Sequence, residues 1–316
     1  MKSSVTRTSR RVLAAAACLT AAVAVASWTP AQKTAQQQEA ARYASPVAAY
    51  RIGLAEWDFG RNKRAVRALE YAASKGVLGA QLKLADLYAH GKGVTRSDGR
   101  AFAYYQAVAD GFADINPRHP VAGYVADAFV QLAGYYRRGV KELEIKASPA
   151  HAVALYRHAA SYFGNAEAQY ALAQMYLKGE GVAQNERLGV NWLVNASRKQ
   201  HAPSQAKLGA LLWHGHAGLR RQPATGLALL MLAQRNAGNT PALGWIRALR
   251  EKILLASQEE DRRSAMQLVA RWSGEPASGL PTKSVKEGSG TGLDRGAPRA
   301  PSSGIMTVGA PGGATH

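Results

Sequence analysis

Apolar residues recur through the middle of this chain at the spacing of α-helical faces, and the pattern itself is repeated. Between Ala152 and Val182, alanine, leucine and tyrosine fall at i, i+3, i+4, i+7 and i+8 in two successive stretches, which predicts two helices of about three turns each. The stretch from Ala65 to Val94 matches it almost position for position. The sequence therefore predicts a helical hairpin that occurs more than once.

One apolar position measures the repeat along the chain. It is occupied in turn by Leu69, Tyr105, Tyr156, Leu193 and Leu230, which are 36, 51, 37 and 37 residues apart. A period of this length is typical of stacked helical hairpins. We therefore expect an all-α fold, a right-handed α/α superhelical solenoid.

The solenoid is expected to span residues 45–272. Ser45 followed by Pro46 favours the start of an amphipathic helix over 45–60, which carries Tyr50, Leu54, Trp57 and Phe59. At the other end, two helices over 245–256 and 258–272 are expected to form a last pair that covers the open end of the stack.

Glycines occur at a fixed phase of the repeat, as Gly91-Lys92-Gly93-Val94 and Gly179-Glu180-Gly181-Val182. A Gly-x-Gly pattern can also belong to a phosphate-binding loop, but here it follows a predicted helix in each copy. Glycine ends helices readily because it adopts the left-handed conformation without a Cβ penalty. We interpret these segments as turns between hairpins.

The spacing of 51 indicates an insertion of about 15 residues in the second unit. We expect it at Phe112 to Val121, where two prolines separate the helix of Tyr104 and Tyr105 from the one that ends at Arg138. An insertion in a solenoid often maps to a loop on the binding face. A surface loop that is merely tolerated is an equally open interpretation.

Residues 1–26 have the order of a secretory signal peptide. Four basic residues precede an uncharged apolar run over 12–26, which is too short to span a membrane, and Ala24-Val25-Ala26 predicts cleavage between Ala26 and Ser27. The pair Arg10-Arg11 leaves Sec and twin-arginine export both open. A retained N-terminal anchor is the alternative. We expect export to the periplasm, with residues 27–44 as a flexible linker.

Residues 273–316 are predicted to be a disordered tail, since 21 of these 44 residues are glycine, proline or serine. The single cysteine, Cys18, lies within the signal run, so the mature chain is expected to hold no disulfide.

Net charge is +19 for the whole chain and +15 without residues 1–26. Because the cations are scattered, an acidic protein surface, an anionic membrane or a polysaccharide fits them better than nucleic acid. A basic surface that binds no partner is also an open interpretation.

Candidate chemistry is sparse. His214 and His216 form the one close histidine pair, at a glycine turn with no third ligand nearby, so we expect no metal site. No nucleophile with a matching base stands out, and neither a cofactor nor a small-molecule substrate is indicated. These observations favour a binding protein over an enzyme.

Two copies of the hairpin carry a shared motif. Ala80-Gln81 and Leu84-Ala85-Asp86-Leu87-Tyr88 correspond to Ala168-Gln169 and Leu172-Ala173-Gln174-Met175-Tyr176, each followed by the glycine turn. This pattern resembles the Sel1-like repeat, a relative of the tetratricopeptide repeat. That resemblance implies an array of hairpins that binds other proteins.

A narrower resemblance covers roughly residues 43–272. The segment Leu132-Ala133-Gly134-Tyr135-Tyr136-Arg137-Arg138-Gly139 and the later Glu260-Asp261-Arg262-Arg263 look like those of the ExoR-type exopolysaccharide production negative regulators of α-proteobacteria. The resemblance implies a periplasmic protein that binds the sensor domain of a membrane histidine kinase and represses exopolysaccharide signalling. The alternative is a periplasmic scaffold in cell-envelope or polysaccharide assembly that has no kinase partner.

Tyr135, Tyr136, Arg137 and Arg138 are the candidate partner-binding residues. They follow the insertion, and tyrosine and arginine are enriched in the energetically dominant positions of protein interfaces. An architectural role between hairpins is an equally open interpretation of these side chains.

Overall fold

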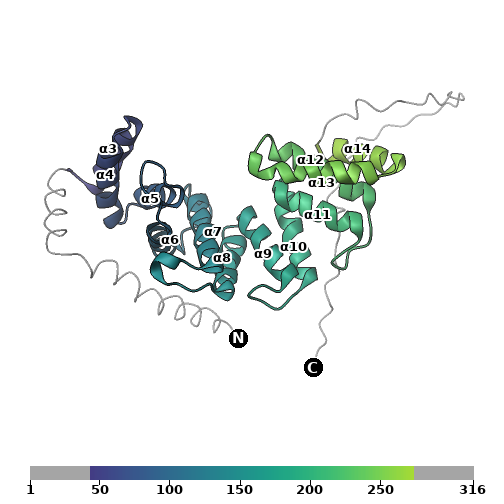
Figure 1. The fold of residues 1–316 in the computed structure, drawn as a ribbon, viewed down its shortest axis with the longest axis horizontal. Coiled ribbons are helices and arrows are strands. Elements are labelled where there is room, and N and C mark those ends of the chain that lie inside the picture. Colours follow the sequence, from purple (N-terminus) through teal and green to yellow (C-terminus); the bar gives the residue numbers. More distant parts are fainter. Residues whose placement is uncertain (1–42, 274–316) are drawn as a thin grey trace, which may run out of the picture. The chain divides into compact units, whose positions relative to one another are not determined.

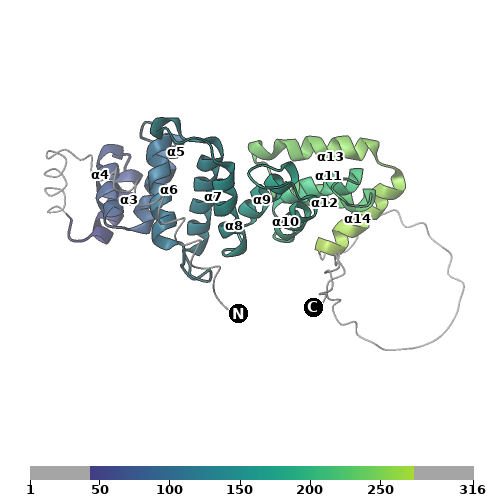
Figure 2. The ribbon, with the colours of Figure 1, turned by 90° about the horizontal axis from the view of Figure 1, so that it is seen from below.

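The computed structural model describes residues 43–273, and apart from one isolated bridge, Val140 to Ile145, its regular elements there are helical (Figures 1 and 2). The α-helices are α3 (Pro46–Asp58), α4 (Asn62–Ser74), α5 (Leu78–His90), α6 (Asp98–Phe112), α7 (Ala122–Arg138), α8 (Pro149–Ser161), α9 (Ala166–Lys178), α10 (Glu186–Arg198), α11 (Ala202–His214), α12 (Pro223–Ala237), α13 (Gly244–Ala256) and α14 (Glu259–Ser273). Two short 3₁₀ turns, η1 (Lys141–Leu143) and η2 (Pro241–Leu243), lie in the connections.

Helices that are consecutive in the chain pack on one another from α3 to α12 (Figure 1). Four hairpins result, namely α4/α5, α6/α7, α8/α9 and α10/α11. The two predicted C-terminal helices are present as α13 and α14, but the prediction that they pack on each other as a last pair is wrong. Both α13 and α14 pack mainly against α12 and not against each other. Together they cover the end of the stack as a three-helix cap.

The repeated apolar position lies in the core of each unit. Its residues are at most 7% exposed, with Leu69, Leu193 and Leu230 fully buried. Small residues next to it let the helices approach closely. A Cβ on Gly226 would lie 2.6 Å from the carbonyl oxygen of Gly209, so α11 and α12 touch backbone to backbone there.

The N-terminal helix begins where the sequence predicts. The Ser45 side chain accepts a hydrogen bond from the amide of Ala48 at 3.1 Å, and Pro46 occupies the first turn. The amphipathic assignment is wrong at Phe59, which lies just past the helix and is 70% exposed. Tyr43, placed in the predicted linker, stacks on Tyr71 with ring centroids 5.4 Å apart.

Glycine turns close the hairpins as predicted. Gly91 and Gly179 end α5 and α9 in the left-handed conformation. Gly181 also has a positive φ of 69°, and a Cβ there would lie 2.3 Å from the carbonyl carbon of Pro149 at the start of α8. The second glycine of this turn is therefore required both by its φ and by close packing.

The insertion of the second unit is spread over four places, so the expectation of a single loop at Phe112 to Val121 is wrong in part. Compared with α4 and α5, α6 is two residues longer and α7 is four residues longer. The connection between α6 and α7 takes six of the extra residues, and the one before α8, which contains η1, takes three.

The predicted signal peptide over 1–26, its cleavage site at Ala26 and Ser27, and nearly all of the predicted linker and tail lie outside the described residues. Of the helices within residues 43–273, none has the length and apolar character needed to cross a membrane.

Candidate protein-binding site

The four candidate residues lie at the C-terminal end of α7, and Tyr135 is part of the core. It is 2% exposed, and its ring contacts those of Phe102 and Tyr105 on α6, each with centroids 6.2 Å apart. The guanidinium of Arg138, which is exposed, lies over the Tyr135 ring at 4.2 Å. Arg138 thus covers the buried tyrosine while presenting its charge to solvent.

Tyr136 occupies the repeat position of Tyr88 and Tyr176. Its hydroxyl donates to Gln106 Oε1 at 3.3 Å on α6, just as the Tyr88 hydroxyl donates to Glu70 Oε1 at 2.9 Å on α4. In the third hairpin the polarity is reversed. There Arg157 on α8 donates to the Tyr176 hydroxyl at 3.2 Å. A tyrosine at this phase therefore joins the two helices of its own hairpin.

Arg137 is engaged with the next hairpin. Its Nε and Nη2 contact the two carboxylate oxygens of Glu180 at 2.5 Å each, in the turn after α9. Both side chains are less than one-third exposed, and the hydrogen bond from Arg137 lowers the pKa of Glu180 below its ordinary value.

Three of the four candidates, Tyr135, Tyr136 and Arg137, are thus held by contacts within the protein. Arg138 is the member of the set whose side chain is exposed. A partner-binding role for the four residues stays a prediction. Arg138 is the one of them that is accessible to a partner.

The two longer connections of the second unit, before and after α7, are each anchored by hydrogen bonds to a helix. The one between α6 and α7 is held by α8, where His158 Nε2 lies 3.0 Å from the carbonyl oxygen of Ala113. The one after α7 returns to the start of α6, where Glu142 accepts hydrogen bonds from the Ser97 hydroxyl at 2.6 Å and the Gly99 amide at 2.8 Å. The hydrogen bond from Ser97 lowers the pKa of Glu142, whose carboxylate also faces the positive end of α6.

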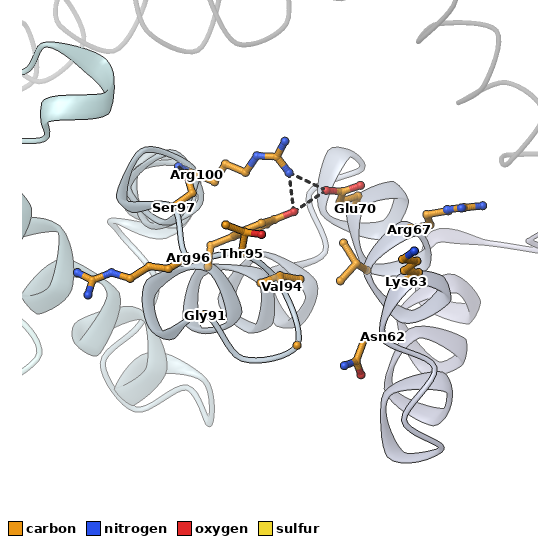
Figure 3. A pocket seen from close by; sticks show the side chains of 13 residues that line it. Asn62, Lys63, Arg67, Glu70, Gly91, Val94, Thr95, Arg96, Ser97 and Arg100 are labelled. Atoms are coloured by element: carbon orange, nitrogen blue, oxygen red, sulfur yellow. Dashed lines mark hydrogen bonds and ion pairs between the residues drawn. The ribbon is translucent and has the colours of Figure 1, made fainter.

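A larger surface feature lies between the first two hairpins, and we call it the basic groove (Figure 3). It has a volume of about 930 Å³ and is walled by α4 on one side and by the turn after α5 and the start of α6 on the other. Its lining residues are Asn62, Lys63, Val66, Arg67, Glu70, Tyr88, Gly91, Gly93, Val94, Thr95, Arg96, Ser97 and Arg100. Four of them are cationic and one, Glu70, is acidic.

Two of the four cations of the basic groove, Arg96 and Arg100, make ion pairs within the protein. Arg100 donates to the Tyr88 hydroxyl at 2.7 Å and lies 3.8 Å from Glu70, the network drawn in Figure 3. Arg96 pairs with Asp98 at 3.2 Å, outside the groove lining. Lys63 and Arg67 on α4 are exposed and make no ion pair with any described residue. The groove therefore keeps an excess of positive charge.

The third hairpin has the same backbone features without these charges. Aligned through Gly91 with Gly179 and Val66 with Val153, Lys63 corresponds to Ala150 and Arg67 to Ala154, while Arg100 corresponds to Leu188. The fold therefore does not require cations at these positions. Our reading of the sequence missed this site because the cations are spread over two helices. A comparison of the exposed positions in the two units would have found it.

The histidine pair singled out from the sequence lies at the C-terminal end of α11 and in the turn that follows it. The rings of His214 and His216 have centroids 5.9 Å apart, and residues 43–273 hold no cluster of three or more histidine, cysteine or acidic side chains arranged for a metal ion. The basic groove is therefore the candidate site in these residues, and it is a charged surface.

The chain is similar to known proteins over most of its length. Residues 79–111, 166–201 and 202–233 match the Sel1 repeat. The exopolysaccharide production negative regulator of Rhizobium meliloti (strain 1021) is 36% identical over 223 residues, which cover 70% of this chain and 80% of that protein. The protein of the same description from Rhizobium leguminosarum bv. viciae is 33% identical over 247 residues, which cover 78% of this chain and 90% of that protein.

Two solved structures share the fold. A protective antigen of uropathogenic Escherichia coli strains that displays an SLR fold aligns with a TM-score of 0.57 and 21% identity, over 83% of this chain and 53% of that chain. A Sel1 repeat protein from Oxalobacter formigenes aligns with a TM-score of 0.51 and 22% identity, over 72% of this chain and 88% of that chain. The predicted solenoid of Sel1-like hairpins is confirmed, and this chain belongs to the ExoR-type family of exopolysaccharide production negative regulators.

Proposed function

We propose that this protein is a negative regulator of exopolysaccharide production that works by binding another protein. The proposed partner is the periplasmic sensor domain of a membrane histidine kinase, and the proposed location is the periplasm, after removal of the signal peptide. Binding would hold the kinase in its non-signalling state, and loss of the regulator would release it.

The family relationship is the observation that carries this proposal. Two relatives that align over at least 80% of their own length are described as negative regulators of exopolysaccharide production. Helical-repeat arrays bind partners through extended surfaces. The charged surface in the described residues suits such binding, whereas a catalytic constellation would need convergent side chains in a pocket.

Crosslinking in intact cells of the native host tests the partner. The tagged protein is crosslinked in the cell envelope and purified, and the captured proteins are identified by mass spectrometry. We expect a membrane histidine kinase, captured through its sensor domain. Recovery of cell-wall or polysaccharide-assembly proteins without any sensor kinase would favour the alternative, a scaffold without a kinase partner.

Location is tested separately, with residues 1–40 fused to alkaline phosphatase, which is active only after export. We expect an active fusion and a mature chain that begins at Ser27. An inactive fusion would contradict the periplasmic assignment.

A further inference from the structure

The basic groove carries two cations that the fold does not use. Lys63 and Arg67 are exposed on α4 and have no ion-pair partner among residues 43–273. The corresponding residues of the third hairpin, Ala150 and Ala154, show that a hairpin of this type forms without them. Charges that the hairpin does not need are available for a ligand.

We propose that the basic groove binds an extended polypeptide segment rich in aspartate and glutamate, presented by the partner protein. The inference rests on the proposed function in one respect, since it assigns that segment to the sensor domain of the kinase. Positive charge along a groove attracts such a segment and orients it as it approaches.

The spacing of the cations fits an extended chain. Lys63 and Arg67 are four residues apart on one helix, so their Cβ atoms are about 6 Å from each other. In an extended segment, side chains i and i+2 point the same way and are about 6.6 Å apart. Two carboxylates separated by one residue can therefore meet Lys63 and Arg67 at the same time.

The rest of the groove favours a polypeptide over a uniformly anionic polymer. Val66 and Val94 give it apolar surface for side chains that lie between the acidic ones. Glu70 would repel a polymer that is negative at every position. Its one aromatic ring, Tyr88, is 4% exposed and offers no open face on which a sugar could stack.

The chain's own C-terminal segment is a poor occupant by charge. Residues 273–316 contain three acidic and four basic side chains, so the segment is not acidic overall. A separate protein is the better source of the carboxylates.

Fluorescence anisotropy with a synthetic probe tests the groove directly. The probe is a labelled peptide that alternates glutamate with serine, and a peptide with glutamine in place of glutamate is its neutral match. The groove variant is Lys63→Ala/Arg67→Ala, which installs the residues of the third hairpin. The control variant is Lys207→Ala/Lys252→Ala, which removes the same charge from exposed positions on α11 and α13. Circular dichroism checks that both variants fold.

We expect the protein to bind the glutamate peptide, with affinity that falls as salt rises, and to bind the glutamine peptide far more weakly. The groove variant should weaken binding about tenfold, as two exposed charge contacts would, and the control variant should change it by less than about twofold. Equal losses in the two variants would overturn the proposal. So would binding of oligogalacturonate or of phosphatidylglycerol vesicles that exceeds peptide binding and is lost in the groove variant.

A pull-down with the kinase sensor domain separates this inference from the proposed function. If the sensor domain binds the unmodified protein and the groove variant equally well, the groove inference fails and the proposed function stands. If it binds neither while the glutamate peptide still depends on Lys63 and Arg67, the proposed function fails and the groove remains a site for acidic peptides. We expect strong binding to the unmodified protein and weak binding to the groove variant.

Discussion

Arg137 on α7 and Glu180 in the turn after α9 face each other with two parallel N–O contacts of 2.5 Å. This pair links the second hairpin to the end of the third, across 43 residues of sequence. It is a charged contact between two hairpins, made at the end of the unit that contains the insertion.

Replacing Glu180 with glutamine should therefore destabilise the protein near neutral pH by about 1 kcal/mol. The two paired side chains are partly shielded from solvent, and a glutamine at this position would keep only part of the hydrogen-bonded geometry. The pKa of Glu180 is lowered in the folded state, so its stabilisation is present above the ordinary value of 4.5 and is lost as pH falls through the folded pKa. Urea unfolding curves should thus show a difference that disappears well below pH 4.5.

Glu259 supplies the control for that experiment. It pairs with Arg263 at 3.2 Å, but both side chains are more than half exposed. Glu259→Gln should leave the free energy of unfolding within error. A loss equal to that of Glu180→Gln would mean that the Arg137 pair has no special structural role.

The turn glycine Gly181 offers a second test. Gly181→Ala should lower the free energy of unfolding by about 2 kcal/mol or more, since it forces a positive φ and sets the new Cβ 2.3 Å from the Pro149 backbone. Gly123→Ala is matched in chemistry but has open space around it in α7. Its melting temperature should be unchanged or higher. Similar losses in both variants would contradict the packing at this turn.

Tyr135 and Arg138 should respond differently to truncation. Tyr135→Ala removes a buried ring and should cost about 3 kcal/mol or more of stability. Arg138→Ala alters an exposed side chain and should cost about 0.5 kcal/mol or a little more, because its stem and charge cover that ring.

Partner capture then separates the roles of these two residues. If Arg138 binds the partner, Arg138→Ala will weaken capture of the sensor kinase in the crosslinking experiment while the protein stays folded. Undiminished capture would leave the segment from Tyr135 to Arg138 with an architectural role only.

The sequence predicted the parts of the fold that depend on a strong periodic signal. The five residues from Leu69 to Leu230 are buried at one phase, and the glycine turns fall where the pattern puts them. Periodicity fixes such positions because a helix can bury only one face, and a hairpin must turn at a residue that tolerates positive φ.

Other features could not be read from spacing. The interval from Tyr105 to Tyr156 gives the total length of the insertion but not its division among two helices and two connections. Tyr135 and Tyr136 are both of a residue type that is common in binding sites. Only the helix register shows that Tyr135 lies in the core and that Tyr136 bonds to Gln106. The basic groove depends on α4 lying opposite the turn after α5 and the start of α6, which no local sequence pattern indicates.

The central claim is repression of exopolysaccharide production through protein binding, and one measurement tests it most directly. Exopolysaccharide output is compared in the native host, in a strain lacking this gene, and in that strain complemented with the unmodified protein or with Lys63→Ala/Arg67→Ala at equal protein level. We predict high output on deletion, full repression by the unmodified protein, and weak repression by the groove variant. Unchanged or reduced output on deletion would contradict the account.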